Sequence, residues 1–231
     1  MDRHPRAIFV GDALGLDFLN SIATPVDTTI DWIDDGDGYL SWLEQARLVP
    51  GDMIRDIRAR ALPGELDKVA DQARSLREWF RSFVRQHKGR PLTSSEALAE
   101  LEPLNRLLER DDMFSRIAPR PTEPAPFALQ TIRRSRAPDA LLLPVGEALA
   151  RLVCEEDFSY VKACEGPACT LLFADHTRGH ARRWAAWRSA ATAPNRPRIG
   201  IGSRQRCEYP GALLSRNHRN RKTTLRIKSD G

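Results

Sequence analysis

Two cysteines near the end of the chain form the clearest chemical motif in the sequence. Cys164 and Cys169 bracket Glu165-Gly166-Pro167-Ala168, so they make a C-x4-C loop with a Gly-Pro turn at its centre. Such a turn brings two thiolates close enough to bind one tetrahedral Zn²⁺. A structural zinc site needs two further ligands. The pair is therefore either half of a metal site or two ordinary thiols.

Two histidines follow the cysteine loop and complete a four-ligand pattern. His176 and His180 extend it to C-x4-C-x6-H-x3-H, and on a helix residues i and i+4 share a face. The six-residue gap is shorter than the hairpin and helix of a two-Cys, two-His finger require. The alternative is a pair of exposed histidines in a basic segment.

The positive charge of the chain is concentrated after the cysteine loop. The 231 residues carry a formal net charge of +5, but residues 185–231 alone carry +9 and the first 184 residues carry −4. A basic C-terminus beside an acidic body is typical of nucleic-acid binding, because phosphate contacts release counterions. A solvated basic tail is the alternative interpretation.

The first two thirds of the chain are predicted to be mainly helical. Asp37 is expected to cap a helix over residues 39–46, and apolar residues at three- and four-residue steps predict a long helix over residues 66–84 that closes at Lys88-Gly89. Thr93 opens a further helix, which Pro103 should kink or split.

Four prolines between residues 118 and 126 predict a connector without regular structure. A short strand is expected over residues 127–132, and Pro138 opens a last core helix. These elements predict a mainly α protein with a small β component, an α+β fold. The predicted parts are a helical body over residues 1–155, a small cysteine-loop domain over 156–184, and a disordered basic tail over 185–231.

The sequence favours binding over catalysis. It contains no Gly-rich phosphate loop, nucleophile elbow or His-Glu-x-x-His motif, so no enzyme is expected. No apolar run is long enough for a membrane span or a signal peptide, so the protein is expected in the cytoplasm. Asp17 and Asn20, in an apolar segment, suggest a small-molecule pocket in a sensing or dimerising domain. A turn hydrogen bond is the alternative for Asp17.

Two stretches of the sequence resemble a bacterial family that has an N-terminal ABATE domain and a C-terminal CGNR zinc finger and is described as stress-induced transcriptional regulators. Residues 14–21, Leu-Gly-Leu-Asp-Phe-Leu-Asn-Ser, and the helix over residues 40–48 are similar to the ABATE opening. Cys164, Cys169 and the segment around residues 173–184 are similar to the first half of the finger.

The resemblance ends after Trp184, where the family continues Cys-Ser-Met-x-x-Cys-Gly-Asn-Arg-Ala-Lys. Codons can be chosen for Ala185 to Gly202 that encode the residues of this chain and, in a frame offset by one base, read Cys-Ser-Met-Ala-Val-Cys-Gly-Asn-Arg-Ala-Lys followed by Gln-Ala-Ala-His-Arg-His-Arg. This ordered match leads to the hypothesis that a single-base deletion after the Trp184 codon put residues 185–231 out of frame.

The resemblance implies a four-cysteine zinc site and DNA as a partner. Cys164 and Cys169 are then the remaining metal ligands, with His176 and His180 as candidate substitutes, so Zn²⁺ binding should be weak or absent and the finger disordered or molten. The resemblance also implies that Arg178, Arg182 and Arg183 contact phosphate and that Trp184 packs under the metal loop. A homodimer is left open, and no membrane partner is expected.

Overall fold

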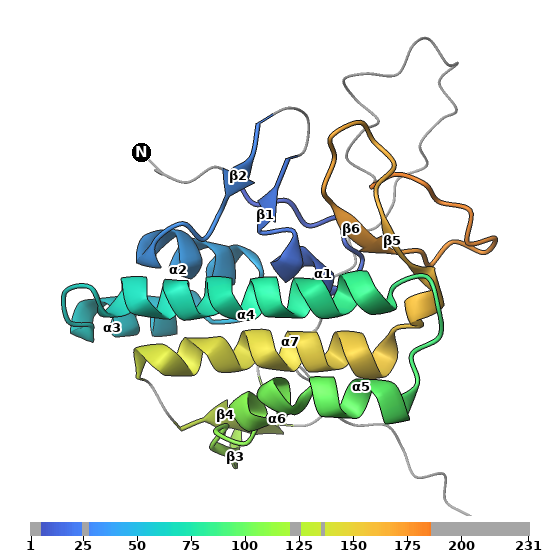
Figure 1. Ribbon diagram of the computed structural model, residues 1–231. Helices are drawn as coiled ribbons and strands as arrows, with labels where there is room; N and C mark the ends of the chain where they lie inside the picture. The colour runs from blue at the N-terminus through green and yellow to red at the C-terminus, as the bar shows by residue number, and fades with distance from the viewer. Residues whose placement is uncertain (1–5, 25–27, 121–125, 135–136, 186–231) are drawn as a thin grey trace, which may run out of the picture. The chain divides into compact units, whose positions relative to one another are not determined.

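The computed structural model describes residues 6–24, 28–120, 126–134 and 137–185 (Figure 1). All of these described residues belong to one compact unit. The predicted disordered tail lies outside the described residues except for Ala185.

Helices dominate the described chain, and the strands pair two by two. The helices are α1 (Leu14–Leu19), α2 (Gly36–Gln45), α3 (Gly51–Arg60), α4 (Glu65–His87), α5 (Ser94–Glu100), α6 (Glu102–Leu108) and α7 (Leu142–Glu155). Three antiparallel pairs join β1 (Ile22–Ala23) to β2 (Ile30–Asp31), β3 (Met113–Pro119) to β4 (Phe127–Arg133), and β5 (Val161–Ala163) to β6 (Leu172–Ala174). Short 3₁₀ turns, Pro138–Leu141 and Phe158–Tyr160, precede α7 and β5. The fold is α+β, as the sequence predicts.

The helix boundaries follow local signals in the sequence, with one correction. Asp35, and not Asp37, is the N-cap of α2, because its side chain accepts a hydrogen bond from the Gly38 N–H at 2.7 Å. Lys88 is the C-cap of α4, and Gly89 follows with a φ of +79°, which glycine adopts without strain. Pro103 lies in the first turn of α6, so the predicted helix is split into α5 and α6.

The proline-rich segment is more regular than its composition predicts. β3 extends to Pro119, which pairs in register with Phe127 of β4, while residues 121–125 lie outside the described residues. A proline at the end of a strand removes a donor that the ladder does not need. The connector is therefore shorter than residues 118–126.

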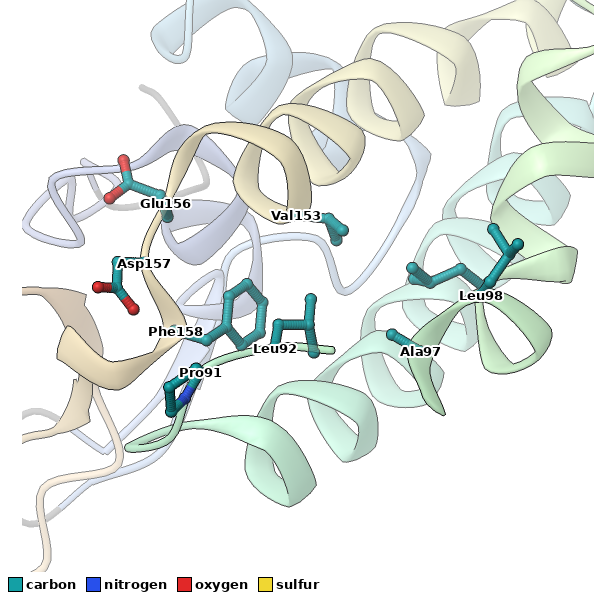
Figure 2. Close-up of a pocket in the computed structure, with 9 residues that line it drawn as sticks. Pro91, Leu92, Ala97, Leu98, Val153, Glu156, Asp157 and Phe158 are labelled. Atoms are coloured by element: carbon teal, nitrogen blue, oxygen red, sulfur yellow. The ribbon is translucent and has the colours of Figure 1, made fainter. Parts of the chain in front are cut away.

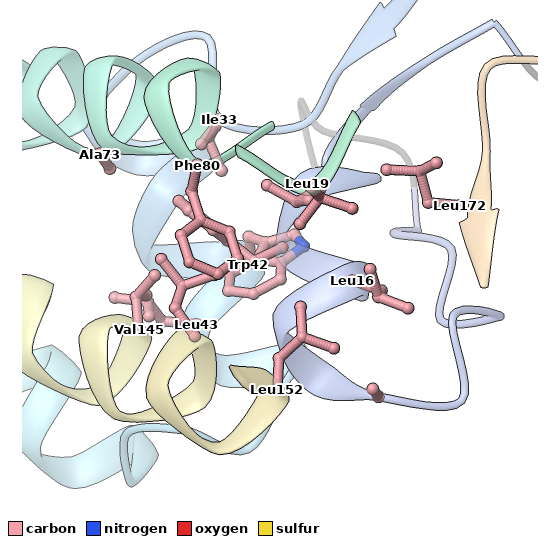
Figure 3. Close-up of a cluster of buried hydrophobic side chains, with 14 of the residues drawn as sticks. Leu16, Leu19, Ile33, Trp42, Leu43, Ala73, Phe80, Val145, Leu152 and Leu172 are labelled. Atoms are coloured by element: carbon pink, nitrogen blue, oxygen red, sulfur yellow. The ribbon is translucent and has the colours of Figure 1, made fainter. Parts of the chain in front are cut away.

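One hydrophobic core joins the helices. α4 and α7 lie side by side in its centre, and α1 packs on both (Figure 1). Figure 3 shows Trp42, Phe80, Leu43 and Val145 meeting between these helices. A Cβ on Gly15 of α1 would lie 2.9 Å from a carbonyl of α7, so the glycine permits this close approach. This contact presents the far side of α1 to the strand β6.

Candidate metal centre and nucleic-acid interface

The cysteine loop joins the two strands of a small hairpin. Cys164 follows β5, and the loop returns through a turn in which the Cys169 N–H donates to the Gly166 carbonyl at 3.0 Å. Pro167 and Ala168 occupy the central positions, and Ala168 has a φ of +57°. A proline followed by a positive φ is the signature of a type II turn. The predicted Gly-Pro turn is confirmed.

Cys164 forms hydrogen bonds with backbone groups of the hairpin and of the segment that follows it. Its own N–H donates to the Leu171 carbonyl at 2.8 Å, and the buried Ala185 donates its N–H to the Cys164 sulfur at 3.4 Å. Cys169 is half-buried against the core. Ala185, the residue directly after Trp184, therefore reaches the sulfur of the first cysteine.

The two histidines lie in a turn and not on a helix. The His180 N–H donates to the Thr177 carbonyl at 3.0 Å, and the His180 ring stacks on Tyr160 with centroids 3.5 Å apart. Its Nδ1 is 2.7 Å from the Asp175 carbonyl oxygen, and His176 Nε2 lies 2.7 Å from a Glu156 carboxylate oxygen. The premise of a shared helix face was wrong, and one nitrogen of each ring is already engaged with a protein oxygen.

The residues that the structure describes do not complete a zinc site. Structural zinc is held almost always by four Cys, His or carboxylate ligands, and within the described residues no cluster of three or more such side chains has the geometry to hold a metal ion. Cys164 and Cys169 supply two thiols. At Ala185 the chain places a backbone N–H beside the Cys164 sulfur, and the alanine side chain has no atom that can bind zinc.

Asp175 organises the loop that follows β6. Its buried carboxylate accepts hydrogen bonds from Lys162 Nζ at 2.7 Å, from the Thr177 hydroxyl at 2.6 Å, and from the N–H groups of Thr177 and Arg182 at 3.1 and 2.9 Å. Burial raises the pKa of Asp175, but these donors outweigh it and hold the pKa well below its usual range. The charged carboxylate thus holds both ends of the loop over residues 177–182 through hydrogen bonds.

The three predicted phosphate-binding arginines have different surroundings. Arg178 is exposed and forms no ion pair or hydrogen bond within the described residues. Arg182 is held inside the protein by Asp12 and the Val10 carbonyl, with its guanidinium 4.3 Å from the Phe173 ring centre. Arg183 is exposed but is paired with Glu165. Only Arg178 is presented to solvent without a partner.

Trp184 differs from its expected position. Its side chain is 48% exposed, and the Arg183 guanidinium lies 5.2 Å from its ring centre. The residue therefore does not pack under the cysteine loop. An exposed aromatic ring next to a guanidinium is a surface on which a base can stack.

The finger half is well packed, contrary to the expectation of a molten segment. Leu171, Leu172, Phe173 and Ala174 are buried and belong to the main core. The Ala174 N–H donates to the Gly11 carbonyl at 2.8 Å, and β6 packs on α1. Burial of this apolar surface stabilises the hairpin independently of metal ligation.

Asn20 joins the helical body to this hairpin. Its buried side chain donates from Nδ2 to the Leu172 carbonyl at 2.8 Å and accepts from the Leu172 N–H at 2.8 Å. The side-chain amide therefore satisfies both backbone groups of one β6 residue, as a neighbouring strand would. Asn20 has a structural role in place of the predicted ligand contact.

Asp17 also binds backbone. One carboxylate oxygen accepts hydrogen bonds from the N–H groups of Val10 and Gly11, each at 2.8 Å. The turn hydrogen bond considered as the alternative to a ligand pocket describes this residue. Burial nevertheless raises the pKa of Asp17 to about 7, against the effect of the two donors.

The raised pKa of Asp17 predicts a pH-dependent stability. The folded chain favours the neutral carboxyl of Asp17. Its contribution to the free energy of unfolding is therefore fully present below about pH 4, the pKa in the unfolded chain, and is lost as the pH rises through about 7. Asp17→Asn keeps an oxygen acceptor without the charge. Between pH 5 and about pH 8 the free energy of unfolding should fall in both proteins. We expect the fall to be about 2 kcal/mol smaller for the variant than for the parent chain.

The measurement is urea unfolding at a series of pH values. Asp52→Asn, at an exposed position in the first turn of α3, is the control and should follow the parent curve. Parallel pH curves for Asp17→Asn and the parent would show that Asp17 does not titrate in this range.

Two known protein families match parts of the chain. Residues 12–156 match the ABATE family, described as a "putative stress-induced transcription regulator". The chain belongs to the ABATE family. Residues 160–191 match the CGNR zinc finger, so the finger match covers Cys164 and Cys169 and ends before Cys207. No curated protein matches the chain significantly.

The ABATE and CGNR matches are to a regulator domain and a zinc finger, and neither describes an enzyme. None of the helices described for this ABATE protein is long and apolar enough to cross a membrane. Within the finger match, sequence reasoning assigned no role to Lys162 or Asp175, the central ion pair. An aspartate directly after a run of buried apolar residues is the one signal that could have indicated a buried charge.

Proposed function

We propose that this ABATE protein is a DNA-binding transcription regulator in which zinc binding and sequence-specific DNA binding are impaired. The observation that carries this proposal is a finger hairpin with only two cysteines, beside which Ala185 occupies the place next to the Cys164 sulfur. Under the frame-change hypothesis that position encodes cysteine in the original frame. A thiol there would be a third candidate ligand next to Cys164.

The frame change after the Trp184 codon is part of this proposal. Codons can be chosen for which both cysteines that the finger lacks are read in the offset frame, at positions 185 and 190. Resequencing the locus tests this directly: a missing base relative to close relatives is expected. An intact reading frame in which the relatives also encode Ala185 would contradict it.

Arg178, Arg183 and Trp184 form the surface that we assign to nucleic acid. Arg178 and Arg183 are exposed, and Trp184 is available for stacking. The sequence after Trp184 adds a charge of +9, which favours salt-sensitive binding without sequence preference. A regulator of this kind acts on DNA in the cytoplasm of a bacterium and requires no catalytic activity.

The Arg178→Ala variant tests this surface. We expect it to bind random and promoter DNA more weakly to the same extent, and to reduce the slope of log affinity against log salt by about 0.9, because one phosphate contact is lost. Binding is measured by fluorescence anisotropy over a salt titration.

Arg106→Ala is the matched control, because Arg106 is an equally exposed arginine on α6, remote in sequence from the finger. Its slope should equal that of the parent chain. The proposal would be contradicted if the parent chain did not bind DNA at low salt, or if both variants lost the same amount of DNA affinity.

A second candidate function is the sensing of a small apolar molecule. An open groove of about 390 Å³ lies between α5 and the end of α7, lined mainly by Leu92, Leu98, Leu101, Val153 and Phe158 (Figure 2). Glu156 at its edge pairs with His176 of the finger loop. A thermal-shift screen of metabolites on the full chain separates a sensor from a purely structural ABATE domain.

A further inference from the structure

The β3–β4 hairpin has one face that is apolar and open to solvent. The register pairs Met113 with Arg133, Ile117 with Leu129, and Pro119 with Phe127. Directly paired residues of an antiparallel ladder lie on the same face. We define the outer face of the hairpin by this set, together with one pair of small hydroxyl residues: Met113, Ser115, Ile117, Pro119, Phe127, Leu129, Thr131 and Arg133.

The large apolar side chains of this outer face are highly exposed to solvent. The exposed fractions are 75% for Ile117, 71% for Leu129, 61% for Phe127 and 50% for Met113. On the opposite face Ala118 is buried, and Phe114 and Ile132 are half-buried. An antiparallel sheet normally directs its apolar face inward and its polar face to water. This hairpin presents large apolar side chains on both faces.

The outer face carries almost no free charge. Its single charged residue, Arg133, is neutralised by Asp111 at 2.9 Å and by Glu147 at 2.6 Å. Arg116 pairs with Gln130 in the register and so lies on the opposite face. Two copies of the outer face can therefore meet without bringing like charges together.

The outer face is also large enough for a weak interface. Its four large apolar side chains expose on the order of 450 Å², so two copies joined face to face bury about 900 Å², which is below the roughly 1,200 Å² of stable specific interfaces and in the range of weak ones. Isolated exposed apolar residues are common on proteins, whereas a patch of this size is comparable to the largest on a typical monomer, and such patches are often functional.

We propose that a second copy of this chain covers the outer face of the β3–β4 hairpin. A face that packs on its own copy about a two-fold axis gives a closed dimer in which both copies of the outer face are covered. In Figure 1 the hairpin lies beyond α6, on the other side of α4 and α7 from the finger hairpin β5–β6. The dimer therefore leaves both fingers accessible, and it does not depend on the proposed DNA binding.

Sedimentation equilibrium of the full chain from about 1 to about 200 µM tests the proposal. The parent chain is expected to dimerise in the micromolar range. Ile117→Glu places a charge at the centre of the interface and should raise the dissociation constant about 100-fold. Leu129→Thr keeps a strand-forming side chain and should raise it about tenfold.

Leu62→Glu provides the matched control. Leu62 is 71% exposed between α3 and α4, outside the hairpin, so the same charge change there should leave the dissociation constant unchanged. Circular dichroism and thermal melting establish that each variant is folded. A parent chain that stays monomeric throughout the range, or equal effects of Ile117→Glu and Leu62→Glu, would overturn the proposal.

Discussion

The variant Ala185→Cys/Ala190→Cys is expected to hold one zinc ion per chain, whereas the unmodified chain should release zinc to a mild chelator. The Ala185 N–H already lies 3.4 Å from the Cys164 sulfur, so a thiol at this position adds a third ligand to an existing pair. Four thiolates complete a tetrahedral site, and structural zinc contributes on the order of 10 kcal/mol to a small module. The gain in zinc affinity should be at least about a thousandfold.

Metal analysis after dialysis against a chelator measures this result. Cys164→Ser added to the double variant should abolish zinc retention, because it returns the site to three ligands. The reverse outcome is equally informative. One tightly held zinc in the unmodified chain, lost on Cys164→Ser, would show that other residues complete the site and that the finger is not impaired.

Asn20→Ala is expected to lower the free energy of unfolding by about 3 kcal/mol. The substitution leaves the N–H and the carbonyl of Leu172 buried without their side-chain partners. Both groups lie in β6, so the loss should be concentrated in the finger hairpin. Amide exchange in residues 171–174 should accelerate more than exchange in the middle of α4.

Thr170→Ala is the control for this prediction. Its hydroxyl accepts a hydrogen bond from the Thr24 N–H at an exposed position of the same junction, where water can replace it. We expect a loss of less than about 0.5 kcal/mol. If Asn20→Ala costs no more than Thr170→Ala, Asn20 does not hold the hairpin on the helical body.

The finger hairpin is anchored by apolar side chains. Phe173 and Leu172 are buried in the core of the ABATE body, so the first half of the finger is packed without a bound metal. A finger that depended on metal alone would unfold without it. The packing explains why a finger hairpin with two cysteines still presents Arg178 and Trp184 in ordered positions.

The sequence by itself determined the local features of this protein. Cap residues, helical periodicity, Pro103 and the Gly-Pro turn of the cysteine loop act through neighbouring backbone, so their effects can be predicted from a few adjacent residues. The family resemblance was equally visible in contiguous motifs, and the match over residues 12–156 confirms it.

Only the tertiary structure decided which polar side chains face solvent and which are held inside. Arg182 and Asn20 belong to motifs that suggest ligand contacts, yet their partners, Asp12 and Leu172, lie about 150 residues or more away in the sequence. The pairing of His176 with Glu156 and the open apolar face of the β3–β4 hairpin have the same origin. A buried polar group must find a partner wherever the fold supplies one, and spacing along the chain does not reveal that partner.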